Sequence, residues 1–220
     1  MLNKLREPVS GLTHLAAAVV SAFGLALLLV IGRGGAAKIV SLAVYGVSLV
    51  LMFSASASYH MVKSTPGVIR WLRKLDHSSI FLLIAGTYTP ICLHFFSGFW
   101  KWGLLAVIWG IAAVGICVKM FILKAPHWLN AAIFLVMGWL SLAAIKEITA
   151  TMPPGALVWL VLGGVFFTLG AVVYIAKKPN PWPGRFGFHE IWHIFVIFGC
   201  ASHFILIAWY IAPRIIAEVT

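Results

Sequence analysis

The stretch "LTHLAAAVVSAFGLALLLVI", residues 12–31, is apolar over almost its whole length and carries no charged side chain. An α-helix needs about 20 such residues to cross the hydrocarbon core of a bilayer. A cleavable signal peptide has an apolar region of only about 7–15 residues, followed by a small-residue cleavage site. The stretch therefore predicts a retained first membrane-spanning helix.

Six further apolar blocks follow, at roughly 39–61, 78–97, 102–123, 128–146, 156–176 and 190–212. The composition agrees with a membrane protein, since 62% of the residues are hydrophobic and 10% are charged, against about 25% charged in soluble domains. Backbone polar groups in lipid must be hydrogen-bonded within the protein, which favours helices. We expect an all-α integral membrane protein of the cell membrane, with seven transmembrane helices in a single domain over residues 1–220.

The basic residues are distributed unevenly between the two sides of this arrangement. Eleven of the 16 Lys and Arg residues lie at the N-terminus or in the second, fourth and sixth connections. They are Lys4, Arg6, Lys63, Arg70, Arg73, Lys74, Lys119, Lys124, Lys177, Lys178 and Arg185. The positive-inside rule predicts a cytoplasmic N-terminus and an external C-terminus. Because these charges are juxtamembrane, the net charge of +11 does not indicate nucleic-acid binding.

Three polar motifs fall at helix ends that share the predicted cytoplasmic side. They are "SASYH" (56–60) at the end of the second block, "LDHSS" (75–79) before the third, and "HEIWH" (189–193) at the start of the seventh. Residues four apart on an α-helix differ by about 40° in direction and about 6 Å in height. His189 and His193 can therefore point toward one position, and so can Ser56 and His60.

This convergence predicts a metal site. His60, His189 and His193 offer three imidazole nitrogens, and catalytic zinc often has three protein ligands and one open position. Asp76 could hold the water on the metal or orient a ligand. Two simpler interpretations remain open: Asp76 could be the N-cap of the third helix, and Ser56 could bond to the backbone of its own helix.

The remaining polar residues fit the site less well. His203 lies about 21 Å along the helix from His189, so we expect a satisfied buried side chain there. His77 is a reserve ligand, and Glu190 is expected to pair with a cation in the preceding loop. Three other histidines are expected at the membrane interface: His14, His94 and His127.

With these motifs assembled, the chain resembles the bacterial haemolysin III-type proteins. That group belongs to the progestin and adipoQ receptor family, within a superfamily that includes alkaline ceramidases. The family pattern Ser-x-x-x-His, Asp and His-x-x-x-His matches "SASYH", Asp76 and "HEIWH"; "EPVSGLTH" (7–14) and "LDHSSIFLLIAGTYTP" (75–90) are similar to the bacterial branch. The resemblance implies Zn²⁺ on His60, His189 and His193. Asp76 would contact it through water, with Ser56 in support.

Three functions follow from this interpretation. The first is a zinc-dependent hydrolase of lipid amides or esters, in which the metal lowers the pKa of water and polarises a carbonyl while Asp76 acts as general base. The second is a non-enzymatic sensor or homeostasis protein for membrane lipids, with structural zinc and Asp76 as a fourth ligand. The third is membrane lysis, which would need a polar stripe through several helices that the sequence does not show.

Overall fold

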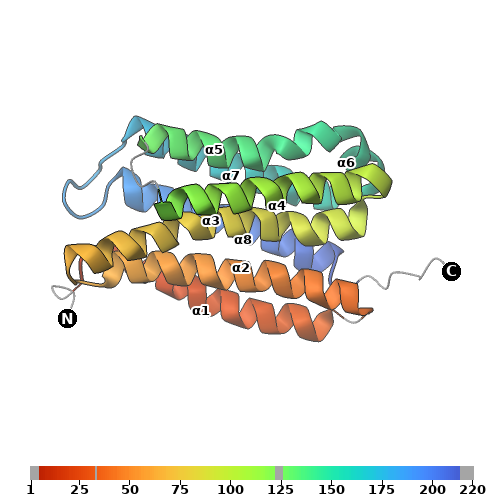
Figure 1. Ribbon diagram of the computed structural model, residues 1–220, viewed down its shortest axis with the longest axis horizontal. Helices are drawn as coiled ribbons and strands as arrows, with labels where there is room; N and C mark the ends of the chain where they lie inside the picture. The colour runs from red at the N-terminus through yellow and green to blue at the C-terminus, as the bar shows by residue number, and fades with distance from the viewer. Residues whose placement is uncertain (1–4, 33, 122–125, 214–220) are drawn as a thin grey trace.

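The computed structural model describes residues 5–32, 34–121 and 126–213. Within these ranges seven helical stretches are long and apolar enough to cross a membrane. They are α1 (Pro8–Ile31), α2 (Ala36–Met61), α3 (Pro66–Phe95), α4 (Gly98–Phe121), the segmented fifth span α5 (His127–Trp139), η2 (Leu140–Ala144) and α6 (Ile145–Thr151), then α7 (Pro154–Ala176) and α8 (Phe188–Tyr210). The predicted all-α, seven-helix membrane fold is confirmed (Figure 1).

The outer surface of the bundle is apolar. Phe23, Phe121 and Val136 are 74%, 86% and 70% exposed. Serine, histidine and aspartate side chains are instead buried inside, among them Ser10, His14 and Asp76. This inverted distribution suits a lipid environment, where apolar side chains are stable outside and polar side chains need partners within the protein.

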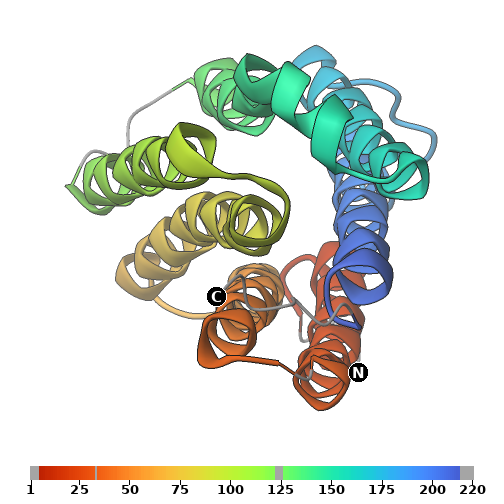
Figure 2. The same cartoon turned by 90° about the vertical axis from the view of Figure 1, so that its right-hand side faces the viewer.

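Viewed end-on, the helices form a ring (Figure 2). Helices that are consecutive in the chain pack together from α1 to α4, α5 packs on α7, and α7 packs on α8. The ring closes because α8 returns to α1 and also contacts α3. We call the end at which α1, α3 and α8 begin and α2 finishes the histidine end of the bundle.

Helix α3 begins twelve residues earlier than the hydropathy pattern predicts. The Thr65 hydroxyl accepts a hydrogen bond from the backbone N–H of Val68 at 3.5 Å, and Pro66 occupies the first helical position. Proline suits that position because its fixed φ is helical and it has no N–H to leave unpaired. The expected connection before residue 78 is therefore mostly helix. The N-cap interpretation of Asp76 is wrong, since Thr65 is the cap.

Four of the 16 basic residues lie outside the described ranges: Lys4 and Lys124, which were counted on the predicted cytoplasmic side, and Arg33 and Arg214 of the other side. The early start of α3 places Arg70, Arg73 and Lys74 on its first turns rather than in a loop. They remain at the histidine end, as the charge count requires. That this end faces the cytoplasm stays a prediction of the positive-inside rule.

The fifth span is broken without a proline. Between α5 and α6 the chain forms the short 3₁₀ segment η2. The Tyr88 hydroxyl on α3 donates to the carbonyl of Gly138 at 2.7 Å and accepts from the backbone N–H of Ser141 at 2.9 Å. It therefore pairs backbone groups that a regular helix would pair internally, which stabilises the break.

We predict that Tyr88→Phe destabilises the protein. The substitution leaves the part-buried N–H of Ser141, within a membrane-spanning segment, without its acceptor, which costs about 1–3 kcal/mol. Thermal unfolding of the detergent-purified protein should show a lower Tm. Tyr210→Phe is the matched control, because the Tyr210 hydroxyl makes no hydrogen bond within the described part of the chain. Equal Tm values for wild type and Tyr88→Phe would contradict the role assigned to this hydroxyl.

Candidate metal centre

Three histidines meet at the histidine end of the bundle. His60 lies in the last turn of α2, while His189 and His193 occupy the first turns of α8. One ring nitrogen from each lies within 4.8 Å of the others. The centroids of the three rings are 4.7–5.1 Å apart. Three nitrogens at this spacing surround a single position that a divalent metal ion could occupy.

The hydrogen bonding of these rings fits metal ligation. His193 is 1% exposed, and neither of its ring nitrogens has a hydrogen-bond partner among the described residues. A buried polar group without a partner is costly, and a metal ion would satisfy it. His60 is 2% exposed and its Nδ1 hydrogen-bonds the Glu7 carboxylate, which leaves Nε2 as its ligand atom.

Glu7 was not identified as a site residue from the sequence. The segment before α1 binds the end of α2, since the Glu7 N–H donates to the His60 carbonyl at 2.9 Å. Arg6 lies 3.2 Å from the Glu7 carboxylate. The hydrogen bond from His60, with the charges of His60 and Arg6, holds the pKa of the Glu7 carboxyl below its usual range against the opposing effect of burial. Glu7 thus presents a carboxylate that orients His60.

His14 is also part of the site, and its expected interfacial position is wrong. Its side chain is 2% exposed, and Nδ1 lies 2.8 Å from the Ser56 hydroxyl. The ring stacks on His193 with centroids 3.8 Å apart and an interplanar angle of 19°. Ser56 therefore pairs with α1. His14 therefore hydrogen-bonds Ser56 and packs against His193.

A spacing pattern could have revealed this face of α1. Glu7, Ser10, Gly11 and His14 recur at i, i+3, i+4 and i+7, which is one stripe of a helix. A methyl group on Gly11 would lie 2.4 Å from the Met61 side chain, so glycine permits α1 to approach the end of α2. The short polar stripe is masked in a hydropathy average by the long apolar run that follows.

Glu190 also belongs to these contacts, rather than pairing with a loop cation as expected. One carboxylate oxygen accepts from the Ser10 hydroxyl at 2.9 Å, and the other accepts from the Gly187 N–H at 2.9 Å. The first bond ties the start of α8 to α1. The second closes the first turn of α8, which fixes the helical segment that carries His189 and His193.

Asp76 lies beside the three histidines but outside the set of ligand atoms within 4.8 Å. It is 8% exposed, and it lines the same end of the neighbouring cavity as Ser56 and His14. His77 faces the neighbouring cavity and is not in the ligand set either. Asp76 is therefore near the centre but is not one of the three grouped ligand residues.

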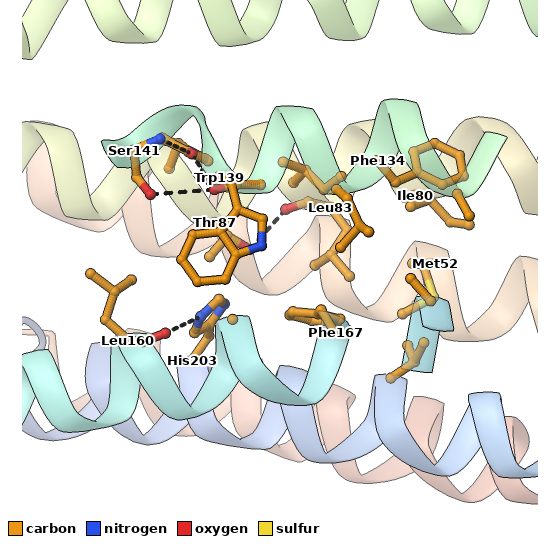
Figure 3. A pocket seen from close by; sticks show the side chains of 18 of the residues that line it. Met52, Ile80, Leu83, Thr87, Phe134, Trp139, Ser141, Leu160, Phe167 and His203 are labelled. Atoms are coloured by element: carbon orange, nitrogen blue, oxygen red, sulfur yellow. Dashed lines mark hydrogen bonds between the residues drawn. The ribbon is translucent and has the colours of Figure 1, made fainter. Parts of the chain in front are cut away.

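A mostly apolar cavity of about 360 Å³ runs through the bundle beside this centre, and none of the three candidate ligand histidines is among the residues that line it. His14, Ser56 and Asp76 line one end, and Phe96 and Ile148 line the other. The twenty residues of α3 between Asp76 and Phe96 correspond to about 30 Å of helix. We call this space the acyl cavity. Met52, Ile80, Leu83, Phe134 and Phe167 are among its walls (Figure 3).

His203 lines the middle of the acyl cavity, far from the three histidines. Its Nε2 lies 3.3 Å from the Leu160 carbonyl (Figure 3), and its ring packs against Phe167. It is half-buried and bonded to the backbone, broadly as expected. The other two histidines thought interfacial do not join the centre: His94 bonds Ser41 at the opposite end, and the side chain of His127 lies outside the described residues.

Comparison with known proteins agrees with this architecture. The family model described as haemolysin-III related matches residues 2–204. The chain belongs to the haemolysin-III related family. It is 34% identical to Hemolysin-3 of Bacillus cereus over 209 residues, covering 94% of this chain and 92% of that protein. It is 35% identical to the Hemolysin-3 homolog of Bacillus subtilis over 214 residues, covering 96% of each.

A more distant similarity extends to eukaryotic seven-helix proteins. The adiponectin receptor protein of Drosophila melanogaster is 29% identical over 151 residues, which cover 61% of this chain and 34% of that protein. Heptahelical transmembrane protein 4 of Arabidopsis thaliana is 28% identical over 169 residues, covering 68% of this chain and 43% of that protein. The predicted family and the multi-pass location in a bacterial cell membrane are confirmed.

We predict that Glu7→Gln weakens metal binding while preserving the fold. Glutamine keeps the shape of the side chain but loses the charge that accepts the His60 N–H. Loss of such a partner costs about 10–100-fold in metal affinity. Competition between the purified protein and a calibrated zinc chelator measures the change. Glu147→Gln is the control, because Glu147 accepts hydrogen bonds from Ser97 at the opposite end. Unchanged affinity in Glu7→Gln would contradict the orienting role.

Proposed function

We propose that this protein is a zinc-dependent hydrolase of lipid amide or ester bonds, with its site near the cytoplasmic face. The observation that carries the proposal is that a group of histidines able to bind a metal lies next to one end of a long apolar cavity. Three histidines, of which His60 and His193 are buried, converge within 4.8 Å, and an apolar cavity about as long as a bilayer is thick begins at residues next to them. An acyl chain in that cavity would present its carbonyl to the centre.

The set of donors fits zinc. Imidazole nitrogens bind zinc, as they also bind copper, iron and nickel, and three histidines leave the fourth tetrahedral position of zinc for water or substrate. In the described residues no fourth histidine, cysteine or carboxylate joins the three nitrogens. Bound zinc would supply a water of lowered pKa and polarise the acyl carbonyl.

Asp76 is assigned as general base and Ser56 as the residue that positions it. The water oxygen adds to the acyl carbonyl carbon, and Asp76 takes the proton that water releases. When the C–N or C–O bond breaks, the same proton passes to the departing amine or alcohol, and the acyl group leaves as a carboxylic acid. The Ser56 hydroxyl is held by His14 at 2.8 Å and lines the same end of the cavity as Asp76, from where it would position the carboxyl.

A non-enzymatic lipid sensor with structural zinc is the second candidate. A closed structural site has four protein ligands, and Asp76 is the residue that could supply the fourth. Its place outside the group of ligand atoms favours the open, catalytic arrangement. The two candidates therefore predict different effects of removing the Asp76 charge. The hydrolase would keep its zinc and lose activity, whereas the sensor would lose its zinc.

The experiment compares zinc content and hydrolysis in wild type, His193→Ala, Asp76→Asn and the control His94→Ala. The probes are an N-acyl amide and an acyl ester of a fluorescent fatty acid, in detergent micelles. We expect about one zinc per chain in all except His193→Ala, as a three-nitrogen site requires. Hydrolysis in Asp76→Asn should fall by about 10²–10⁴-fold, the usual contribution of a general base.

Two outcomes would reject the hydrolase. Wild type without zinc would remove the centre on which the proposal rests. Zinc in wild type that is lost in Asp76→Asn, with neither probe hydrolysed, would instead identify Asp76 as a fourth ligand and support the sensor. Because His94 lies at the opposite end and bonds Ser41, its variant shows whether any histidine loss harms the protein in general.

We also predict that Gly164→Leu shortens the acyl cavity. Gly164 lines the cavity midway along α7, and an added Cβ there would have only ordinary contact with Trp139 at 3.5 Å. The larger side chain should block long acyl chains, so the ratio of long-chain to short-chain hydrolysis falls about tenfold or more. Gly110→Leu is the control, since Gly110 has open space and does not line the cavity. An unchanged ratio would exclude this route for the chain.

A further inference from the structure

A second hollow, of about 300 Å³, lies at the histidine end between the start of α1 and the loop before α8. We call it the polar hollow. Its walls include His189, a candidate ligand, and Glu7, which orients His60. The acyl cavity borders the same centre at His14, whose ring stacks on His193, and at Ser56 and Asp76. The centre thus lies between an apolar space and a polar one.

The carboxylates of the polar hollow are already engaged. Glu7 accepts from His60 and lies 3.2 Å from Arg6. Both oxygens of Glu190 accept hydrogen bonds, from Ser10 and from the Gly187 N–H. Neither carboxylate is therefore available to hold a cationic ligand without breaking contacts that position the centre.

The two guanidinium groups of the hollow are not fully paired within the described part of the chain. Arg6 lies over the Tyr59 ring at 4.1 Å, and its Nη2 is buried without a hydrogen-bond partner in the described part of the chain. Arg185 is exposed, and it makes no ion pair with any carboxylate of the described residues. The start of α8, whose helix dipole is positive at that end, forms part of the same wall.

We propose that the polar hollow binds a phosphate group, and that the substrate is a lipid with a phosphate-bearing headgroup. This rests on the proposed function, and it names the substrate class of that site. Guanidinium groups bind phosphate through paired, charge-assisted hydrogen bonds. A lipid whose phosphate lies against Arg6 and Arg185 can extend its acyl chain into the acyl cavity. The linking carbonyl then lies at the three histidines.

The test measures binding of ether-linked lipids, which contain no acyl bond to hydrolyse. Native mass spectrometry of the protein as purified compares a dialkyl glycerol phosphate with the dialkyl glycerol that has the same chains and no phosphate. Wild type should prefer the phosphate lipid by about tenfold or more, as expected for charge-assisted hydrogen bonds. Arg185→Gln should abolish most of this preference. Lys178→Gln, which changes an exposed cation of the same loop outside the hollow, should retain it.

Competition with inorganic phosphate shows whether the polar hollow binds the phosphate of a lipid or a free phosphate ion. It should displace the phosphate lipid only weakly, because it gains nothing from the acyl cavity. Equal affinity for the two lipids, an equal effect of the Arg185 and Lys178 variants, or full displacement by low inorganic phosphate would each overturn the proposal. Since no hydrolysis is involved, failure here leaves the hydrolase intact. If the protein prefers the phosphate lipid but contains no zinc and hydrolyses neither acyl probe, the hydrolase proposal is rejected and phosphate binding still stands.

Discussion

A buried imidazole in a membrane protein needs a partner for its ring nitrogens, because lipid offers none. The histidine end contains three such rings, those of His14, His60 and His193, and the partly exposed ring of His189. His60, His189 and His193 contact one another, and His14 stacks on His193. The contacts around them are arranged to satisfy this requirement. Glu7 takes one nitrogen of His60, and Ser56 takes one of His14. The nitrogens of His193 are left for a ligand of another kind.

Helix α1 has the central part in this arrangement, although it contributes none of the three nitrogens in the ligand set. Through Glu7 it holds the end of α2, and through Ser10 it holds the start of α8. Both elements carry metal-ligand candidates. Their relative position is therefore set by a third helix and not only by their own packing. Outer partners of this kind fix the direction and the basicity of a metal's ligands.

The sequence was sufficient for the fold and for part of the site. Each apolar block is long enough to span a bilayer, and the number of spans decides which ends share a side. Successive spans cross the membrane in opposite directions, so the end of the second span and the start of the seventh lie on the same side. His60 and His189 could therefore be assigned to one end. The hydropathy pattern failed at α3, where its first turns carry Arg70, Arg73 and Lys74 and so resemble a loop. The true start of α3 is marked instead by Thr65, the N-cap, and Pro66, the first helical residue.

The sequence by itself determined the seven spans, the family motifs and the shared end of the three histidines. Only the tertiary structure decided that Glu7, His14 and Glu190 join them, and that Asp76 stands beside the nitrogens instead of among them. The physical reason is that hydropathy fixes where a helix lies along the membrane normal but not how it is rotated. Rotation follows from side-chain packing between helices that are distant in the sequence, such as α1 and α8.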